Sequence, residues 1–342
     1  MATALDELEA AKQRMGKWQE EADELLRSVF LDPSAAEARE RITGSGRTLR
    51  LRVEAASLLD DFGYTVRTRF PYPVALRWRE AQARLSAGEH TLAYEAVLDT
   101  AEILLCYSAL LVAALAREEG IELGELSAVR DKFRTGRGGP GFGEWAALLG
   151  EISGSRKRRG LAAEHPLNDL GALLSDTRAT RARQRLSGRR NDQAHLRRVD
   201  PVDLPQALQE AFTDLTTLME EARFLADWPL VHVTAVRWDA LRGSARVDYR
   251  ELTGDHPVVP TSTMTHDGND LEVGSLYLRD REHRLHLLRP FLVGRNCPVC
   301  RSWSTFHVDK VVAGVASLKS LEHGHTTDDP ETGDALRHVG LL

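Results

Sequence analysis

The chain has few cysteines and no excess of basic residues, and both shortages narrow its class. Only three of its 342 residues are cysteine, at 106, 297 and 300, too few for a disulfide framework. The net charge of −6 argues against a protein that coats nucleic acid non-specifically. The N-terminus lacks a basic segment followed by an apolar core, so no secretory signal is expected. These features predict a cytoplasmic protein.

Long hydrophobic runs are also scarce. The longest apolar candidate, Ile103–Leu115, is shorter than the about 20 residues that a membrane-spanning helix needs, and it carries Tyr107 and Ser108. We therefore expect no membrane partner. Hydrophobic residues make up 42% and charged residues 28%, which are ordinary values for a globular protein. The length allows two domains or three small ones.

Periodicity divides the chain into three parts and predicts an α+β fold. Residues 1–70 show helical patterns and form an N-terminal helical region. Residues 74–227 have helical spacing throughout and predict a helical bundle. From residue 228 the pattern alternates with a period of two, which predicts a small β-rich domain over 228–342. Pro71 and Pro73 predict a non-helical connector at 62–73.

Inside the middle part, residues 91–118 predict a long apolar helix at the centre of the bundle. Glu95, Asp99 and Glu102 form one acidic ridge on it, at spacings of four and three. The ridge either faces water, or Glu102 pairs with Arg190 and holds its guanidinium in place. Further along, the glycines of residues 136–141 predict a flexible turn, which lacks the Gly-Lys-Ser/Thr ending of a phosphate loop.

Residues 190–195, Arg-Asn-Asp-Gln-Ala-His, bring together side chains that suit phosphodiester cleavage without a metal. Imidazole titrates near neutral pH, so His195 can move a proton, and Arg190 can stabilise charge on a phosphate. Asn191 lies about 40° from His195 around a helix, whereas Arg190 lies about 140° away. Arg190 must then sit in the entering turn, reach around the helix, or serve a second subunit. The simpler interpretation is a surface helix start capped by Asn191, with a solvated His195.

The segment resembles the HEPN superfamily of helical ribonucleases, which carries an Arg-x4–6-His motif, often with Asn after the Arg. Ala194 matches the small residue that often precedes the His. The resemblance extends over residues 75–227, where helical patterns at 76–87 and 91–118, a Gly-Trp helix near 142–149, the motif and a closing helix follow the family's order. It implies a HEPN-like bundle whose Arg190 and His195 meet those of a second subunit in one composite site. Such proteins commonly act as toxin or defence nucleases.

Two functions from different classes remain open. In the first, a homodimer cleaves single-stranded RNA through Arg190, Asn191 and His195, leaving a 2′,3′-cyclic phosphate and needing no metal for catalysis. The β-rich domain then senses a trigger or docks a partner, such as an antitoxin or a member of a defence complex. In the second, the bundle is a non-catalytic adaptor that holds protein or nucleic acid. Retention of both Arg190 and His195 favours the first.

Basic residues gather ahead of the motif. Residues 151–200 contain twelve Lys/Arg against six Asp/Glu. On the helix that precedes the motif, which Gly188 is expected to end, arginines recur at helical spacing. The stripe predicts either an RNA backbone track or a solvated helix face, and its members are Arg178, Arg181, Arg185 and Arg189.

The C-terminal part contains a Cys-x-x-Cys turn, Cys297-Pro298-Val299-Cys300. Two thiolates on such a turn can converge on one zinc ion, but a structural site needs four ligands. His323 and His325, on either side of Gly324, are the preferred second pair, and His307 is the other candidate. The alternatives are a knuckle without metal or a redox pair, although no thioredoxin-like context supports redox chemistry. Cys106, in the apolar helix, is expected to be inert core.

Overall fold

The computed structural model describes residues 17, 61–135, 138–256 and 258–342. The chain forms two compact units, Met1–Tyr64 and Thr65–Leu342, and the fold described below concerns the second unit and the helix that leads into it. The N-terminal helical region expected over residues 1–70 lies, as far as residue 60 and apart from residue 17, outside the described part of the chain.

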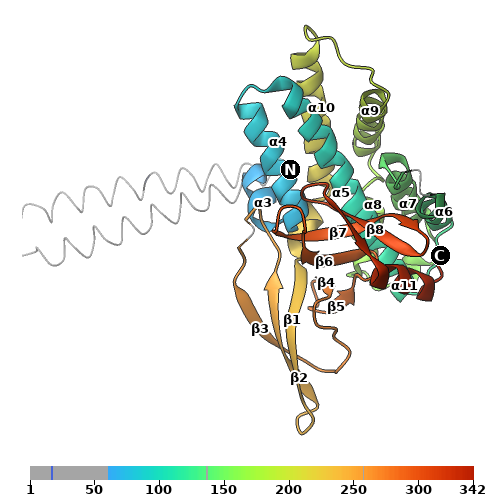
Figure 1. The fold of residues 1–342 in the computed structure, drawn as a ribbon. Helices are drawn as coiled ribbons and strands as arrows, with labels where there is room; N and C mark the ends of the chain where they lie inside the picture. The colour runs from blue at the N-terminus through green and yellow to red at the C-terminus, as the bar shows by residue number, and fades with distance from the viewer. Residues whose placement is uncertain (1–16, 18–60, 136–137, 257) are drawn as a thin grey trace, which may run out of the picture. The chain divides into compact units, whose positions relative to one another are not determined.

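The helical part follows the expected order (Figure 1). Its helices are α3 (Phe62–Arg69), α4 (Tyr72–Ser86), α5 (His90–Glu118), α6 (Glu125–Thr135), α7 (Phe142–Gly154), α8 (Pro166–Ala172), α9 (Thr177–Ala194) and α10 (Leu204–Glu221), with short 3-10 turns at Arg158–Gly160 and Arg223–Asp227. The central helix is α5, which packs against α4, α7, α8, α9 and α10. Its side chains from Leu104 to Ala116 are all buried, so the core of the bundle surrounds this helix.

Because α5 is both long and apolar, it passes the length and composition test for a membrane span, contrary to our expectation that no stretch does so. However, 83% of the most apolar 18-residue stretch of α5 is buried inside the protein, as expected of the central helix of a bundle.

Two boundaries differ from those predicted. The segment expected to connect without helix contains α3, and α4 begins at Tyr72, immediately after Pro71. Proline is tolerated in a first helical turn because the N–H it lacks has no partner there, so Pro71 and Pro73 start a helix instead of blocking one. Gly188 does not end the basic helix, since α9 continues to Ala194. The penalty of one glycine, about 1 kcal/mol, is small beside the packing of α9 on α10.

The fold is α+β, because two antiparallel sheets follow the bundle. The first has the order β3-β2-β1-β4-β5 and the second β6-β7-β8-β9. The strands are β1 (Leu230–Asp239), β2 (Ser244–Glu251), β3 (Thr261–His266), β4 (Leu276–Arg279), β5 (Leu285–Leu287), β6 (Leu292–Asn296), β7 (Trp303–Val312), β8 (Val315–Ser320) and β9 (Thr326–Asp329). Helix α11 (Pro330–His338) packs on β8.

The helical and β-rich parts belong to one compact unit. Helix α6 packs against β7 of the second sheet, and α5 contacts β5 of the first, so both sheets lie against the bundle (Figure 1). The change from helix to strand that the sequence places at 227/228 therefore falls within this unit. The packing brings residues of α5 and α9 close to those of β7 and β8.

Candidate functional site

Arg190 lies on the side of α9 that faces α5. Its Nε donates to Oε2 of Glu102 at 2.7 Å, and its Nη2 lies 3.2 Å from Oδ1 of Asp99. Its Nη1 donates to Oε1 of Gln193 at 3.1 Å. Burial disfavours the charge of the guanidinium, but Glu102 and Asp99 outweigh this effect and raise the pKa of Arg190 above its ordinary value. Of the two alternatives for the acidic ridge, a solvated face or a pair between Glu102 and Arg190, the structure shows the pair.

His195 and Asn191 are exposed on the same segment. His195 is the C-cap of α9, and its backbone N–H donates to the carbonyl of Asn191 at 3.0 Å. Within the described residues, neither side chain forms a hydrogen bond or ion pair. The next residue, Leu196, is 81% exposed. One chain therefore holds Arg190 against α5 and leaves His195 open to solvent or to another molecule.

The predicted arginine stripe divides into two pairs. Arg185 and Arg189 both bind the buried carboxylate of Asp214 on α10, with Nε and Nη1 donating at 2.9 Å. Arg189 also binds Glu210 at 2.7 Å. These two arginines therefore link α9 to α10.

The other two members, Arg178 and Arg181, are exposed. The side chain of Arg178 is 79% exposed, and its nearest carboxylates lie at the margin of ion pairing, 3.6 Å away on Asp176 and 4.0 Å away on Glu221. Arg178 and Arg181 are the members of the stripe most available to a nucleic acid.

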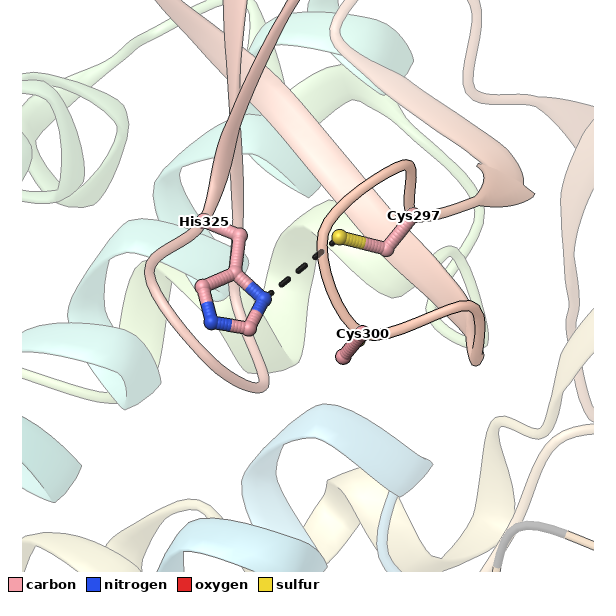
Figure 2. Close-up of side chains that lie close together, drawn as sticks. All are labelled: Cys297, Cys300 and His325. Carbon is pink, nitrogen blue, oxygen red and sulfur yellow. Dashed lines mark hydrogen bonds between the residues drawn. The ribbon is translucent and has the colours of Figure 1, made fainter.

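The Cys-x-x-Cys turn and His325 come together, as Figure 2 shows. The turn lies between β6 and β7, and His325 lies just before β9. Sγ of Cys297 is 3.4 Å from Nδ1 of His325, and the ligand atoms of Cys297, Cys300 and His325 all lie within 4.8 Å of one another. This group can hold a metal ion, since thiolates and imidazole nitrogen are zinc's preferred ligands.

The turn also favours a thiolate. Burial raises the pKa of the Cys297 thiol. The backbone N–H groups of Cys300 and Val299 lower this pKa by more than burial raises it, so the net shift is downward. Gly324 has φ of +69°, the left-handed conformation expected to let the chain fold back beside His325.

The structure places the other two candidate ligands differently. His323 is exposed and does not belong to the three-residue group, although its ring centroid lies 5.7 Å from that of His325. His307 lies on β7 and packs edge-on against Trp145 of α7, with ring centroids 6.0 Å apart. The ring of His323 therefore lies beside that of His325 but outside the group formed by Cys297, Cys300 and His325.

A polar cavity of about 250 Å³ adjoins Arg190. It is lined by side chains from the bundle and from the second sheet, which include Asp99, Glu102, Arg190, His307, Asp309 and Lys319. From the sequence His307 was expected only as a zinc ligand, and no role was predicted for Asp309 or Lys319. The alternation over 303–312 and 315–320, interrupted by Ala313-Gly314, is the signal that would have predicted this hairpin and brought residues 307 and 319 together.

Comparison of the chain with protein-family models, with curated proteins and with solved structures finds no match.

Proposed function

We propose that the chain is a metal-independent endoribonuclease of the HEPN type, active in the cytoplasm as a toxin or antiviral effector. The observation that carries the proposal is the arrangement of one short segment. Arg190 is fixed by Glu102 and Asp99, while Asn191 and His195, at the end of the same helix, are exposed. A fixed cation and an exposed imidazole near the end of one helix suit a composite site completed by a second copy of the chain.

In this mechanism the 2′-oxygen of RNA attacks the adjacent phosphorus and the bond to the 5′-oxygen breaks. The products are a 2′,3′-cyclic phosphate and a 5′-hydroxyl. A two-fold interface brings two copies of His195 to one site, so that one accepts the 2′-hydroxyl proton and the other protonates the leaving oxygen. Arg190 retains N–H groups beyond the three atoms engaged by Glu102, Asp99 and Gln193, and these can stabilise the charge that develops on the phosphate.

The test compares wild type, Arg190→Ala and His195→Ala on a single-stranded RNA. Wild type should cleave in EDTA-containing buffer without added metal, and each variant should lose at least about 100-fold in rate, the contribution typical of a positioned acid or base. His90→Ala, which removes another exposed histidine, is the matched control and should remain active. Full activity of His195→Ala would refute the nuclease proposal.

The alternative, a non-catalytic adaptor, is favoured by one observation. The charge of Arg190 is already balanced by two carboxylates of its own chain, as in an arginine that only joins helices. In that case wild type should not cleave RNA, and Arg190→Ala should lower the melting temperature. The variant Arg190→Lys would then be more stable than Arg190→Ala. In a nuclease, however, the cleavage rate of Arg190→Lys would remain low, because Lys lacks the planar fork of the guanidinium.

We further propose that the Cys297, Cys300 and His325 group holds structural zinc. The group supplies three of the four ligands of a closed tetrahedral site. His323 is our candidate for the fourth, because its ring lies next to that of His325 on the same turn. The zinc would tie the β6–β7 turn to the β8–β9 turn and would take no part in cleavage.

A further inference from the structure

The cavity beside Arg190 contains polar groups that neither proposal uses. Its walls come from five separate elements, α4, α5, α7, α9 and the β7–β8 hairpin with the turn that follows it. At about 250 Å³ it is smaller than the roughly 300 Å³ at which pockets for drug-sized ligands begin. Its volume limits an occupant to a small polar molecule or to one end of a larger one.

His307 presents a hydrogen-bond acceptor in this cavity. The side chain is 5% exposed, and its Nδ1 lies 3.0 Å from the carbonyl oxygen of Val308. A carbonyl only accepts, so Nδ1 carries the hydrogen. Burial and the charge of Lys319 lower the pKa of His307 to about 4, so the ring is neutral at pH 7 and Nε2 keeps its lone pair. Nε2 has no hydrogen-bond partner among the described residues.

Lys319 lies directly opposite His307 in the β7–β8 register. It is half-buried and forms no ion pair within the described ranges. Asp309, two residues beyond His307, lies where the register of the hairpin shifts, and it too has no ion-pair partner in the described chain. A bulge of this kind often re-aims a side chain at a binding site. The described lining of the cavity therefore includes an unpaired cation, Lys319, an unpaired carboxylate, Asp309, and a neutral acceptor, His307.

Gly139 and Pro140 close the side of the cavity next to Asp309. A Cβ at Gly139 would lie 2.3 Å from Oδ1 of Asp309 and 2.7 Å from its carbonyl oxygen, so only glycine fits at that position. Pro140, the next residue, lines the cavity. The close approach of the backbone at residue 139 to Asp309 of β7 therefore explains why glycine occupies position 139.

We propose that this cavity binds a ribose phosphate, either as a free metabolite or as the end of an RNA strand. The ammonium of Lys319 would bind the phosphate, with Arg190 at the edge of the site. Nε2 of His307 and the carboxylate of Asp309 are both acceptors and would receive hydrogen bonds from the ribose hydroxyls. The inference concerns binding alone and does not depend on whether the chain cleaves RNA.

The experiment is calorimetric titration of the full-length protein with ribose 5-phosphate, AMP and a 5′-phosphorylated tetraribonucleotide. Saturable binding of at least one is expected, and which one binds identifies the source. Lys319→Met should weaken it about tenfold or more, as loss of a charged hydrogen bond does. 2-Deoxyribose 5-phosphate should bind more weakly than ribose 5-phosphate.

Lys310→Met is the matched control, because Lys310 is on the same hairpin but does not line the cavity, and it should bind as wild type does. Melting curves establish that the variants fold, and Lys319→Arg, which keeps the charge, should retain part of the affinity. Absence of binding by all three probes, or equal affinity in a folded Lys319→Met, would overturn the proposal. Neither the calorimetric titration nor the melting curves depend on RNA cleavage. A failure of the binding proposal is therefore distinct from a failure of the nuclease proposal.

Discussion

Individual carboxylates of α10 determine how strongly Arg185 and Arg189 of α9 stabilise the fold. Asp214 is 3% exposed and accepts hydrogen bonds from both Arg185 and Arg189. The oxygens of a buried carboxylate need such partners, because desolvation otherwise makes the charge unfavourable. Glu210 also binds Arg189 but is half-exposed, so solvent screens its interaction. The two acids therefore differ in their effect on stability although they share a partner.

We predict that Asp214→Asn lowers the free energy of unfolding by about 2 kcal/mol, because the charge-assisted bonds to Arg185 and Arg189 are lost. Glu210→Gln should cost less than about 1 kcal/mol, as exposed ion pairs do. Urea denaturation followed by circular dichroism measures both. Equal losses in the two variants would contradict the difference in burial on which the prediction rests.

His286 makes stability depend on pH. Its Nδ1 lies 2.9 Å from Oε2 of Glu118 and its Nε2 3.1 Å from Oδ2 of Asp280. Because carboxylates only accept, both ring nitrogens carry hydrogens and the imidazole is charged. Burial lowers the pKa of His286. Glu118 and Asp280 raise this pKa by more than burial lowers it, so the net shift is upward.

A raised histidine pKa stabilises the fold fully below the unfolded value of about 6.5, and this contribution is lost as pH rises through the folded pKa. His286→Gln should therefore be less stable than wild type at pH 6, by about 1–3 kcal/mol, with a gap that narrows toward pH 9. Denaturant titrations at several pH values measure the gap. A gap that widens with pH would contradict the sign.

His165 needs a control, since its ring centroid lies 6.0 Å from that of His286 and the two charges interact. Burial lowers the pKa of His165, so its own contribution changes with pH in the opposite sense. Repeating the comparison in a His165→Asn background removes this contribution. Asn preserves an acceptor for the helix cap that Nδ1 of His165 now provides to Leu167.

At the scale of elements, local patterns predicted what is local. The spacing of Glu95, Asp99 and Glu102 placed these acids on one face of α5, because residues three and four apart share a helix face. Two of them, Asp99 and Glu102, meet Arg190. The division of the arginine stripe could not be read in the same way. It depends on Asp214, which lies 25 residues or more along the chain, and only tertiary packing brings α10 beside α9.

At the Cys-x-x-Cys site, too, the sequence predicted the local contacts but not those that depend on tertiary packing. Cys297 and Cys300 share one turn, so their convergence follows from local sequence. His325 joins them through the β7–β8 hairpin, which the sequence analysis did not single out. The choice among His307, His323 and His325 therefore required the strand register, which puts His307 opposite Lys319.

We predict that purified protein contains about one zinc per chain, the count expected of a single site. Cys297→Ser and His325→Ala should lose the metal and melt at lower temperature, because the free energy of binding contributes to folding. Val299→Ala, in the same turn, should keep the metal. Elemental analysis with melting curves measures both effects. Metal-free wild type that melts like Cys297→Ser would show that the turn binds no ion.

At the scale of the whole molecule, the exposed end of α9 is the surface that the proposed function needs. Leu196 and Val202, on either side of the loop after His195, are 81% and 86% exposed. Apolar side chains next to polar site residues are typical of an interface core surrounded by a polar rim. Because a two-fold contact uses the same patch on both partners, this surface would pair with itself and bring two copies of His195 together.

We therefore predict a dimer with twice the 38.0 kDa mass of one chain, measured by light scattering. Leu196→Asp and Val202→Asp together should yield monomers and abolish cleavage, since a buried charge without a partner opposes association. Leu241→Asp is the control, because Leu241 is fully exposed on the turn between β1 and β2, and it should leave the dimer intact. A monomer that still cleaves RNA would show that one chain completes the site. The cavity beside Arg190 would then be the place to look for the missing acid and base.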